Sequence, residues 1–274
     1  MATVAEPLAD NSPRPDRLSG TPRAHALDRW IYVITAAGFI AIVLAGFIPS
    51  SLAKIEAVQA GQRAPFPLVL HMHAVLMGAF LMLLLAQTSL VATGRSALHG
   101  KLGIASMVIA PAIVVVGFIL VPTNYHATWG AAQFGPPEVR AQMQQVVSLV
   151  DNIMLLQFRA GILFPLFLWI GLRARGRDDG LHKRMMILAT AIPLGAGIAR
   201  IPGLPSTMPS SPLAQDLYIL LAVSPMLLWD IARNRYVHRA WQLWLGIFLA
   251  SALAVNALWD TPWWHATARQ IMGV

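Results

Sequence analysis

Cysteine is absent from the 274-residue sequence, and charged residues make up only 12% of it, about half the share in a soluble domain. The lack of cysteine excludes disulfide frameworks, iron–sulfur clusters and thiolate metal sites. The low charge, together with 57% hydrophobic residues, excludes a disordered chain and argues against an ordinary cytosolic enzyme. The sequence also has no catalytic triad, phosphate-binding loop or His-Glu-x-x-His motif, so no class of enzyme is indicated.

The apolar residues are gathered in long blocks. A helix needs about 20 apolar residues to cross the hydrocarbon core, and seven blocks meet or approach this length. The predicted spans are Trp30–Ile48, Leu68–Ala92, Leu102–Val121, Val147–Leu172, Met185–Arg200, Leu213–Trp229 and Ala240–Trp259. The fifth is short and contains Pro193. The sequence predicts an all-α, polytopic bundle of seven transmembrane helices over residues 30–274, after a mobile cytoplasmic tail over residues 1–29.

The basic residues indicate how the bundle is oriented. The net charge of +8 resembles that of a nucleic-acid binder, but the basic residues lie between apolar blocks. Fourteen of them fall in the tail and in the loops on its side, five fall on the other side, and Arg159 lies inside a span. The positive-inside rule therefore predicts a cytoplasmic N-terminus and a periplasmic C-terminus in a bacterial inner membrane. The lipid bilayer is the expected partner, and nucleic acid is not.

The fourth predicted span carries polar residues that are costly at membrane depth. Arg159 lies fourteen residues from the inner end at Arg173, roughly 21 Å along the helix. Asn152 shares its face, and Asp151 lies about 80° away from that face. One interpretation is that Arg159 pairs with Asp151, Asp216 or a backbone carbonyl and joins helices. The other is that it binds an anionic group such as a carboxylate or a haem propionate.

Histidines lie near both ends of the predicted spans. His71 and His73 open the second span in the outer third, at the level of Arg159, Asn152 and Arg200. Two residues apart on a helix, they differ by about 200° in direction, so they form a weak metal motif. We nevertheless expect an outer pocket with His71 and His73 as metal ligands and with Arg159, Asp151, Asn152 and Arg200 binding a cofactor. Its further candidate lining residues are Asp216, Tyr218 and Asn256.

At the inner side, His99 and His182 precede the third and fifth spans beside basic residues. They are either interfacial anchors or parts of a site for a cofactor or an anionic lipid between helix N-termini.

Several elements resemble those of a widespread family of bacterial seven-span membrane proteins. In that family the second span begins with His-x-His and ends in Gln-Thr-x-Leu-Val-Ala-x-Gly, which matches Gln87–Gly94. A Leu-His-Arg-x-Leu-Gly element precedes the third span, and a His-Lys-Arg-x-Met element opens the fifth, which ends at an arginine matched by Arg200. The terminal Thr-Pro-Trp at residues 261–263 also carries the resemblance. The chain departs at Gly100, where the family commonly has arginine, so an anionic contact at that position is in doubt. The resemblance covers about residues 30–265 and implies the architecture but no activity.

Three classes of function agree with these features. The first is a redox protein that holds haem or copper through histidines. The second is a small-molecule transporter, receptor or sensor that uses the outer polar pocket. The third is an accessory or assembly subunit of a membrane complex, whose polar residues only join helices. An intramembrane enzyme acting on lipid or isoprenoid substrates is a further alternative.

Overall fold

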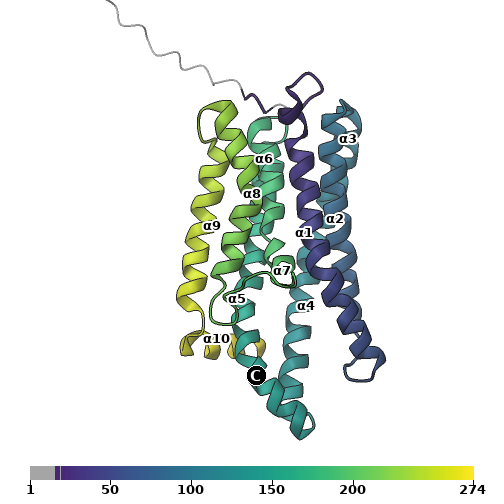
Figure 1. Cartoon of the computed structure of the whole chain (residues 1–274), viewed down its shortest axis with the longest axis vertical. Coiled ribbons are helices and arrows are strands. Elements are labelled where there is room, and N and C mark those ends of the chain that lie inside the picture. The colour runs from purple at the N-terminus through teal and green to yellow at the C-terminus, as the bar shows by residue number, and fades with distance from the viewer. Residues whose placement is uncertain (1–15, 19) are drawn as a thin grey trace, which may run out of the picture.

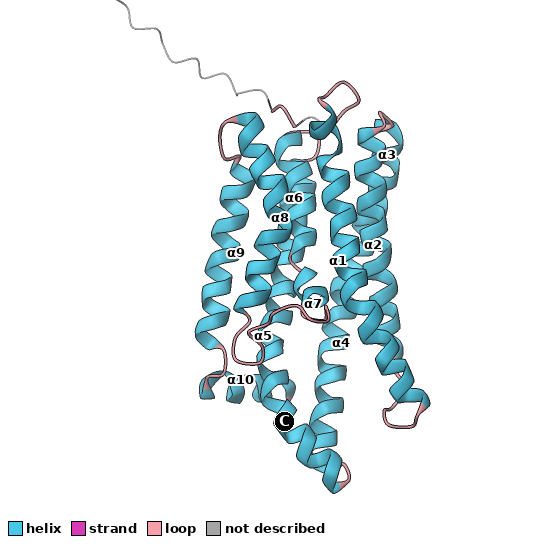
Figure 2. Ribbon diagram, in the orientation of Figure 1, coloured by secondary structure: helices cyan, strands magenta, loops and turns pink. Residues whose placement is uncertain are grey.

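The computed structural model describes residues 16–18 and 20–274, and every regular element in these residues is a helix (Figure 2). In chain order they are α1 (Ala26–Gln59), α2 (Leu68–Ala92), α3 (Ser96–Leu102), the 3₁₀ helix η1 (Gly103–Ala105), α4 (Ser106–Phe134), α5 (Pro137–Ala174), α6 (Asp179–Ala191), α7 (Leu194–Ile198), α8 (Leu213–Asn234), α9 (Arg239–Leu258) and α10 (Pro262–Met272).

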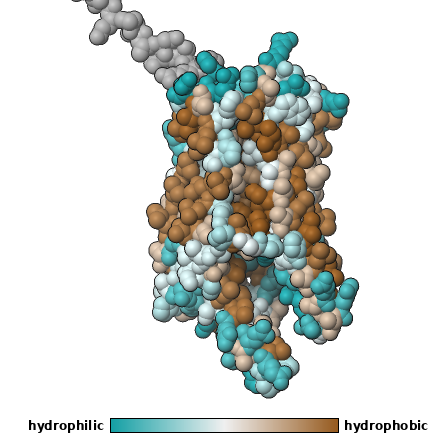
Figure 3. Space-filling view, viewed as in Figure 1, coloured by the Kyte–Doolittle hydropathy of each residue, from teal (hydrophilic) through white to brown (hydrophobic). Residues whose placement is uncertain are grey.

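Six helical runs are long and apolar enough to cross a membrane: α1, α2, the run from α3 through α4, α5, α8 and α9. They correspond to six of the seven predicted spans. Their outward faces remain apolar, since Val75, Phe118 and Leu253 are 71%, 59% and 73% exposed. Figure 3 shows apolar residues over the middle of one face and hydrophilic residues at both ends. This pattern is that of a bundle surrounded by lipid.

The long helices lie side by side, and α10 lies across one end (Figure 1). α1, α6 and α9 begin at the other end, which we call the basic end, and the C-terminus lies opposite it (Figure 1). α5 is central to the packing because it contacts α4, α6, α9 and α10. The main core is formed by large side chains from several helices, among them Phe39, Phe80, Phe167 and Trp244, each at most 2% exposed.

The fifth predicted span, Met185–Arg200, is not one continuous helix. α6 ends at Ala191, and the five-residue α7 begins after Pro193. Proline has no N–H to donate and its ring clashes with the preceding turn, so the helix breaks there. A non-helical segment over residues 199–212 then leads to α8. The prediction of a continuous fifth helix was therefore wrong.

The short α7 packs unusually closely on α1. A Cβ at Gly46 would lie 2.0 Å from the carbonyl oxygen of Gly197, and a Cβ at Gly197 would lie 3.3 Å from the Cα of Val43. Only residues without a side chain permit this approach. The broken element is thus held against α1 by backbone contact.

The predicted tail over residues 1–29 is only partly described, because residues 1–15 and 19 lie outside the described residues. Leu18 is fully buried in the main core. α1 begins at Ala26, with the side chain of His25 accepting a hydrogen bond from the Leu27 N–H. The last four residues of the predicted tail are therefore helical.

Candidate functional site

A buried ion pair joins the middle of α5 to the first turn of α8. Nη2 of Arg159 donates to Oδ1 of Asp216 at 2.5 Å, and the two side chains are 7% and 5% exposed. The guanidinium also lies 5.3 Å from the ring centroid of Phe248 on α9, within the range of a cation–π contact. Among the partners considered from the sequence, Asp216 is therefore the one that Arg159 contacts.

The pair does not use all of its hydrogen-bonding capacity. Nη1 of Arg159 and Oδ2 of Asp216 are buried, and neither has a hydrogen-bond partner among the described residues. Leaving a buried donor or acceptor unpaired costs about 1–3 kcal/mol, and more for charged groups. One donor and one acceptor are thus available here to a further polar molecule.

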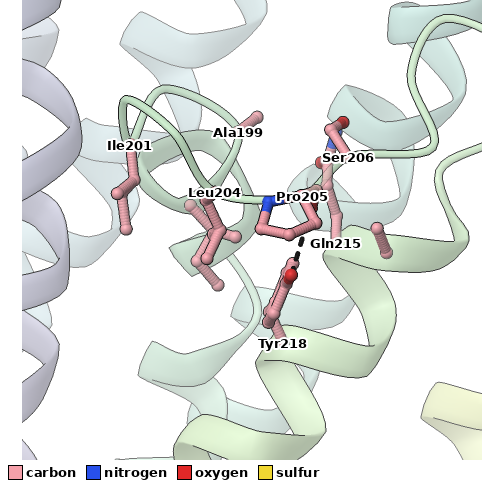
Figure 4. Close-up of a pocket in the computed structure, with 9 residues that line it drawn as sticks. Ala199, Ile201, Leu204, Pro205, Ser206, Gln215 and Tyr218 are labelled. Carbon is pink, nitrogen blue, oxygen red and sulfur yellow. Dashed lines mark hydrogen bonds between the residues drawn. The ribbon is translucent and has the colours of Figure 1, made fainter.

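A small cavity lies where α7, the segment 199–212 and α8 meet, and neither Arg159 nor Asp216 lines it (Figure 4). Its volume is about 20 Å³, enough for about one water. The cavity is lined by Ile198, Ala199, Ile201, Leu204, Pro205, Ser206, Ala214, Gln215 and Tyr218. Gln215 precedes Asp216 in the chain, and Tyr218 donates to the carbonyl oxygen of Pro205 at 3.1 Å (Figure 4). Most residues of the segment 199–212 are exposed, and Ala199, Ile201, Leu204, Pro205 and Ser206 line this cavity.

Asp151 and Asn152 belong to a different cluster, at the end of the bundle where α10 lies. Asp151 is fully buried, and its carboxylate accepts from Tyr125 at 2.7 Å and from Arg269 at 3.2 and 3.3 Å. Nδ1 of His265 lies 3.0 Å from the same carboxylate. This cluster attaches α10 to α4 and α5.

The amide of Asn152 has a similar role one residue along. Its Oδ1 accepts from the backbone N–H of Asp260 at 2.9 Å. Asp260 has a positive φ of 58° in the turn between α9 and α10. Both polar residues thus hold α10 rather than extend the Arg159 site.

The other predicted outer residues are dispersed. His71 is exposed, with its ring centroid 6.0 Å from that of Phe66, and His73 is half-buried with its Nδ1 unpaired. Arg200 is exposed, lies just after α7, donates to the carbonyl of Ala196 and has its guanidinium 4.9 Å from the ring centroid of Phe47. No group of three or more metal-ligating His, Cys, Asp or Glu side chains occurs within residues 16–18 and 20–274. Of the residues expected to form one outer pocket, Arg159 and Asp216 contact each other, whereas His71 and Arg200 lie against Phe66 and Phe47.

His99 and His182, in contrast, come together at the basic end. Their ring centroids are 6.4 Å apart and the rings are inclined at 80°. Nδ1 of His99 lies 3.3 Å from the carbonyl oxygen of Gln87 on α2. Nδ1 of His182 lies 2.8 Å from the carbonyl oxygen of Gly171 on α5. His99 on α3 and His182 on α6, 83 positions apart in the sequence, therefore lie next to each other.

Sequence reasoning missed a second buried ion-pair network, also at the basic end. The Arg184 side chain is fully buried, and it donates to Asp230 at 2.5 and 2.8 Å and to Asp16 at 2.8 and 3.0 Å. Asp230 also accepts from the indole N–H of Trp241 at 2.7 Å. In the sequence, Arg184 stands among basic residues between two apolar blocks, a position that indicates membrane orientation rather than burial. Asp230 directly follows the apolar block Leu213–Trp229, and a carboxylate at this position could have indicated that a basic residue is buried beside it.

Comparison of this chain with protein-family models, curated proteins and solved structures finds no match. The resemblance to the bacterial seven-span family therefore stays a prediction. The functional argument depends on the geometry alone.

Proposed function

We propose that this chain is a seven-span inner-membrane protein that binds a small carboxylic acid between α5 and α8, as a transporter, receptor or sensor. The observation that carries the proposal is the buried Arg159–Asp216 pair with one unpaired donor and one unpaired acceptor. The carbonyl of a carboxylic acid accepts from Nη1 of Arg159, and its O–H donates to Oδ2 of Asp216. In a low-dielectric site such charge-assisted hydrogen bonds are strong.

The broken helix that leads into α8, which carries Asp216, supports a transport or sensing role. Discontinuous helices at membrane depth form the binding sites of many transporters. The 20 Å³ cavity holds about one water, so a larger ligand requires displacement of the segment 199–212. This segment has no helical hydrogen-bond ladder to break, and its movement enlarges the cavity from the side opposite the basic end.

The proposal also includes the orientation of the chain in the membrane and a seventh membrane crossing. α6, α7 and residues 199–212 together lead from the basic end toward the beginning of α8 (Figure 1). Counted with the six long helices, this element makes seven crossings, which places the termini on opposite sides. The excess of Lys and Arg at the basic end supports a cytoplasmic location for that end in a bacterial inner membrane.

An accessory or assembly subunit is the second candidate, favoured by the Asp151 and Arg184 clusters that join helices. In that case the Arg159–Asp216 pair also only joins helices and binds no ligand. Replacing a buried ion pair by apolar residues is often neutral or stabilising. The double variant Arg159→Met/Asp216→Leu would then be as stable as the wild type and keep the partner complex intact. A haem or copper centre on His71 and His73 is not favoured by the geometry, since the two rings face different neighbours.

A thermal-shift screen of detergent-purified protein tests the proposal, with acetate, glycolate, lactate and succinate as probes. We expect at least one of them to raise the Tm of the wild type and not that of Arg159→Met. Arg200→Met is the matched control, because Arg200 is exposed and unconnected with the pair, and it should respond like the wild type. Equal shifts in all three proteins, or no shift in any, would contradict the proposal.

A further inference from the structure

The two histidines at the basic end have the orientation of metal-binding imidazoles. A backbone carbonyl can only accept a hydrogen bond, so the Nδ1 that faces it carries the proton. This applies to His99 against Gln87 and to His182 against Gly171. The Nε2 of each neutral ring then has a free lone pair. Metal-binding histidines are typically oriented in this way, by donation from the second ring nitrogen to a carbonyl or carboxylate.

The separation of the two rings fits a shared ion. Metal–nitrogen bonds to imidazole are about 2.0–2.1 Å long, so two rings on opposite sides of one ion have centroids roughly 6.4 Å apart. The observed separation is 6.4 Å. A tetrahedral pair would bring the centroids roughly 1 Å closer. The centroid separation is thus compatible with an ion that accepts two nearly opposed nitrogen ligands.

A thioether and an amide lie near the pair. Met186 lies one turn after His182 on the same face of α6. A Cβ at Gly171 would lie 3.3 Å from Sδ of Met186, so this thioether is next to the carbonyl that orients His182. Gln87, whose carbonyl orients His99, has a buried Oε1 without a hydrogen-bond partner.

A positively charged side chain lies close to the pair. Arg175 donates to the carbonyl oxygen of Gly100, which follows His99, at 3.1 Å. A guanidinium at this position repels a divalent cation more strongly than a monovalent one. Imidazole and thioether ligands suit copper, and thioethers select its monovalent form.

We propose that His99 and His182 bind a copper(I) ion at the basic end of the bundle, with Met186 as a nearby soft donor. This site is separate from the Arg159–Asp216 pair and does not depend on the function proposed for it. No electron transfer is required of it, because the ion binds without a change of oxidation state.

The test is a competition between purified protein and the chromophoric copper(I) chelator bicinchoninate, under anaerobic conditions with ascorbate. We expect the wild type to remove one equivalent of copper(I) from the chelator, and His99→Ala and His182→Ala each to weaken binding at least tenfold. His71→Ala is the matched control, since His71 is an exposed histidine elsewhere in the bundle, and it should bind like the wild type. Met186→Leu keeps the apolar volume and should weaken binding by a smaller factor.

Circular dichroism and the Tm of each variant show whether it is folded. If one alanine variant does not fold, His99→Gln and His182→Gln provide the same comparison with a side chain of similar size. The proposal is overturned if the wild type takes no copper(I), if the His99 and His182 variants bind as tightly as the wild type, or if Zn²⁺ binds through the same histidines as tightly as copper(I).

Discussion

Asp16 and Arg184 are 168 positions apart in the sequence, yet both oxygens of the carboxylate accept hydrogen bonds from the guanidinium, at 2.8 and 3.0 Å. Asp16 also receives Nζ of Lys183 at 2.7 Å, while Oδ1 of Asn234 accepts from the N–H of Arg17 at 2.8 Å. The segment before α1 is therefore bound to the basic end at α6 and α8.

We expect Asp16→Asn to release this segment. Arg184 keeps its contacts with Asp230, so only the contribution of the Asp16 carboxylate is lost, about 2 kcal/mol for a charge-assisted pair that is partly exposed. Trypsin should then cleave after Arg17 about 30-fold faster, since 1.4 kcal/mol corresponds to a factor of ten. Glu138→Gln, on an exposed residue at the start of α5, is the control. An unchanged cleavage rate in Asp16→Asn would show that the ion pair does not hold the segment.

The same contact should depend on pH at the acidic end of the scale. Burial raises the pKa of Asp16, but the hydrogen bonds and charges of Arg184 and Lys183 outweigh it and hold the pKa below its ordinary value of 3.8. A carboxyl group with a lowered pKa stabilises the bound state fully above its ordinary pKa, and this contribution is lost as the pH falls below that value. Protection of Arg17 from an acid-tolerant protease should therefore persist at pH 5 and decline below about pH 3.8. Loss of protection near pH 6 instead would assign the release to a histidine.

The close contact between α1 and α7 gives a prediction with a control in the same helix. Gly46→Ala places a Cβ 2.0 Å from a backbone oxygen of Gly197, whereas a Cβ at Gly38 has nothing within 4 Å. We expect Gly46→Ala to lower the free energy of unfolding by about 2–3 kcal/mol, because backbone must move. Gly38→Ala should be neutral or stabilising by up to about 1 kcal/mol. Both are measured by unfolding in mixed detergent micelles, and equal stabilities would exclude the α1–α7 contact.

The attachment of α10 depends on Asp151. Asp151→Ala leaves the hydroxyl of Tyr125 without its acceptor and removes the counter-charge of Arg269, so we expect a loss of about 3–5 kcal/mol. Tyr125→Phe removes one hydrogen bond to a charged group and should cost about 1.5–3 kcal/mol. The emission of Trp264, whose indole N–H donates to the carbonyl of Asp151 at 2.8 Å, should shift toward that of a solvated indole in Asp151→Ala. A wild-type spectrum in that variant would mean that α10 stays attached without the carboxylate.

The sequence predicted the helices well because a membrane span is a local property of about 20 residues. It also singled out Arg159 and included Asp216 among its partners, since a charge at membrane depth needs a counter-charge. The break after Ala191 was missed although Pro193 lies in the middle of the predicted block, because a proline does not by itself decide the outcome: Pro165 and Pro225 lie inside the unbroken helices α5 and α8. Arg184 was missed because burial depends on Asp16 and Asp230, which are distant in the chain.

The histidines show that spacing in the sequence does not by itself identify which side chains lie close together. The His-x-His motif at His71 and His73 predicted a pair of metal ligands, but two side chains at i and i+2 of a helix point in different directions. His99 and His182 had no shared motif, and only the packing of α3 against α6 near α2 and α5 brings them together.

The most direct measurement is isothermal titration of the purified protein with the carboxylate that gives the largest thermal shift. We predict binding to the wild type and to Arg200→Met with the same affinity. We predict at least a tenfold loss in Arg159→Met and in Asp216→Leu, because each removes one of the two groups that the ligand contacts. Binding of equal affinity in Arg159→Met and the wild type would contradict a ligand site at the Arg159–Asp216 pair.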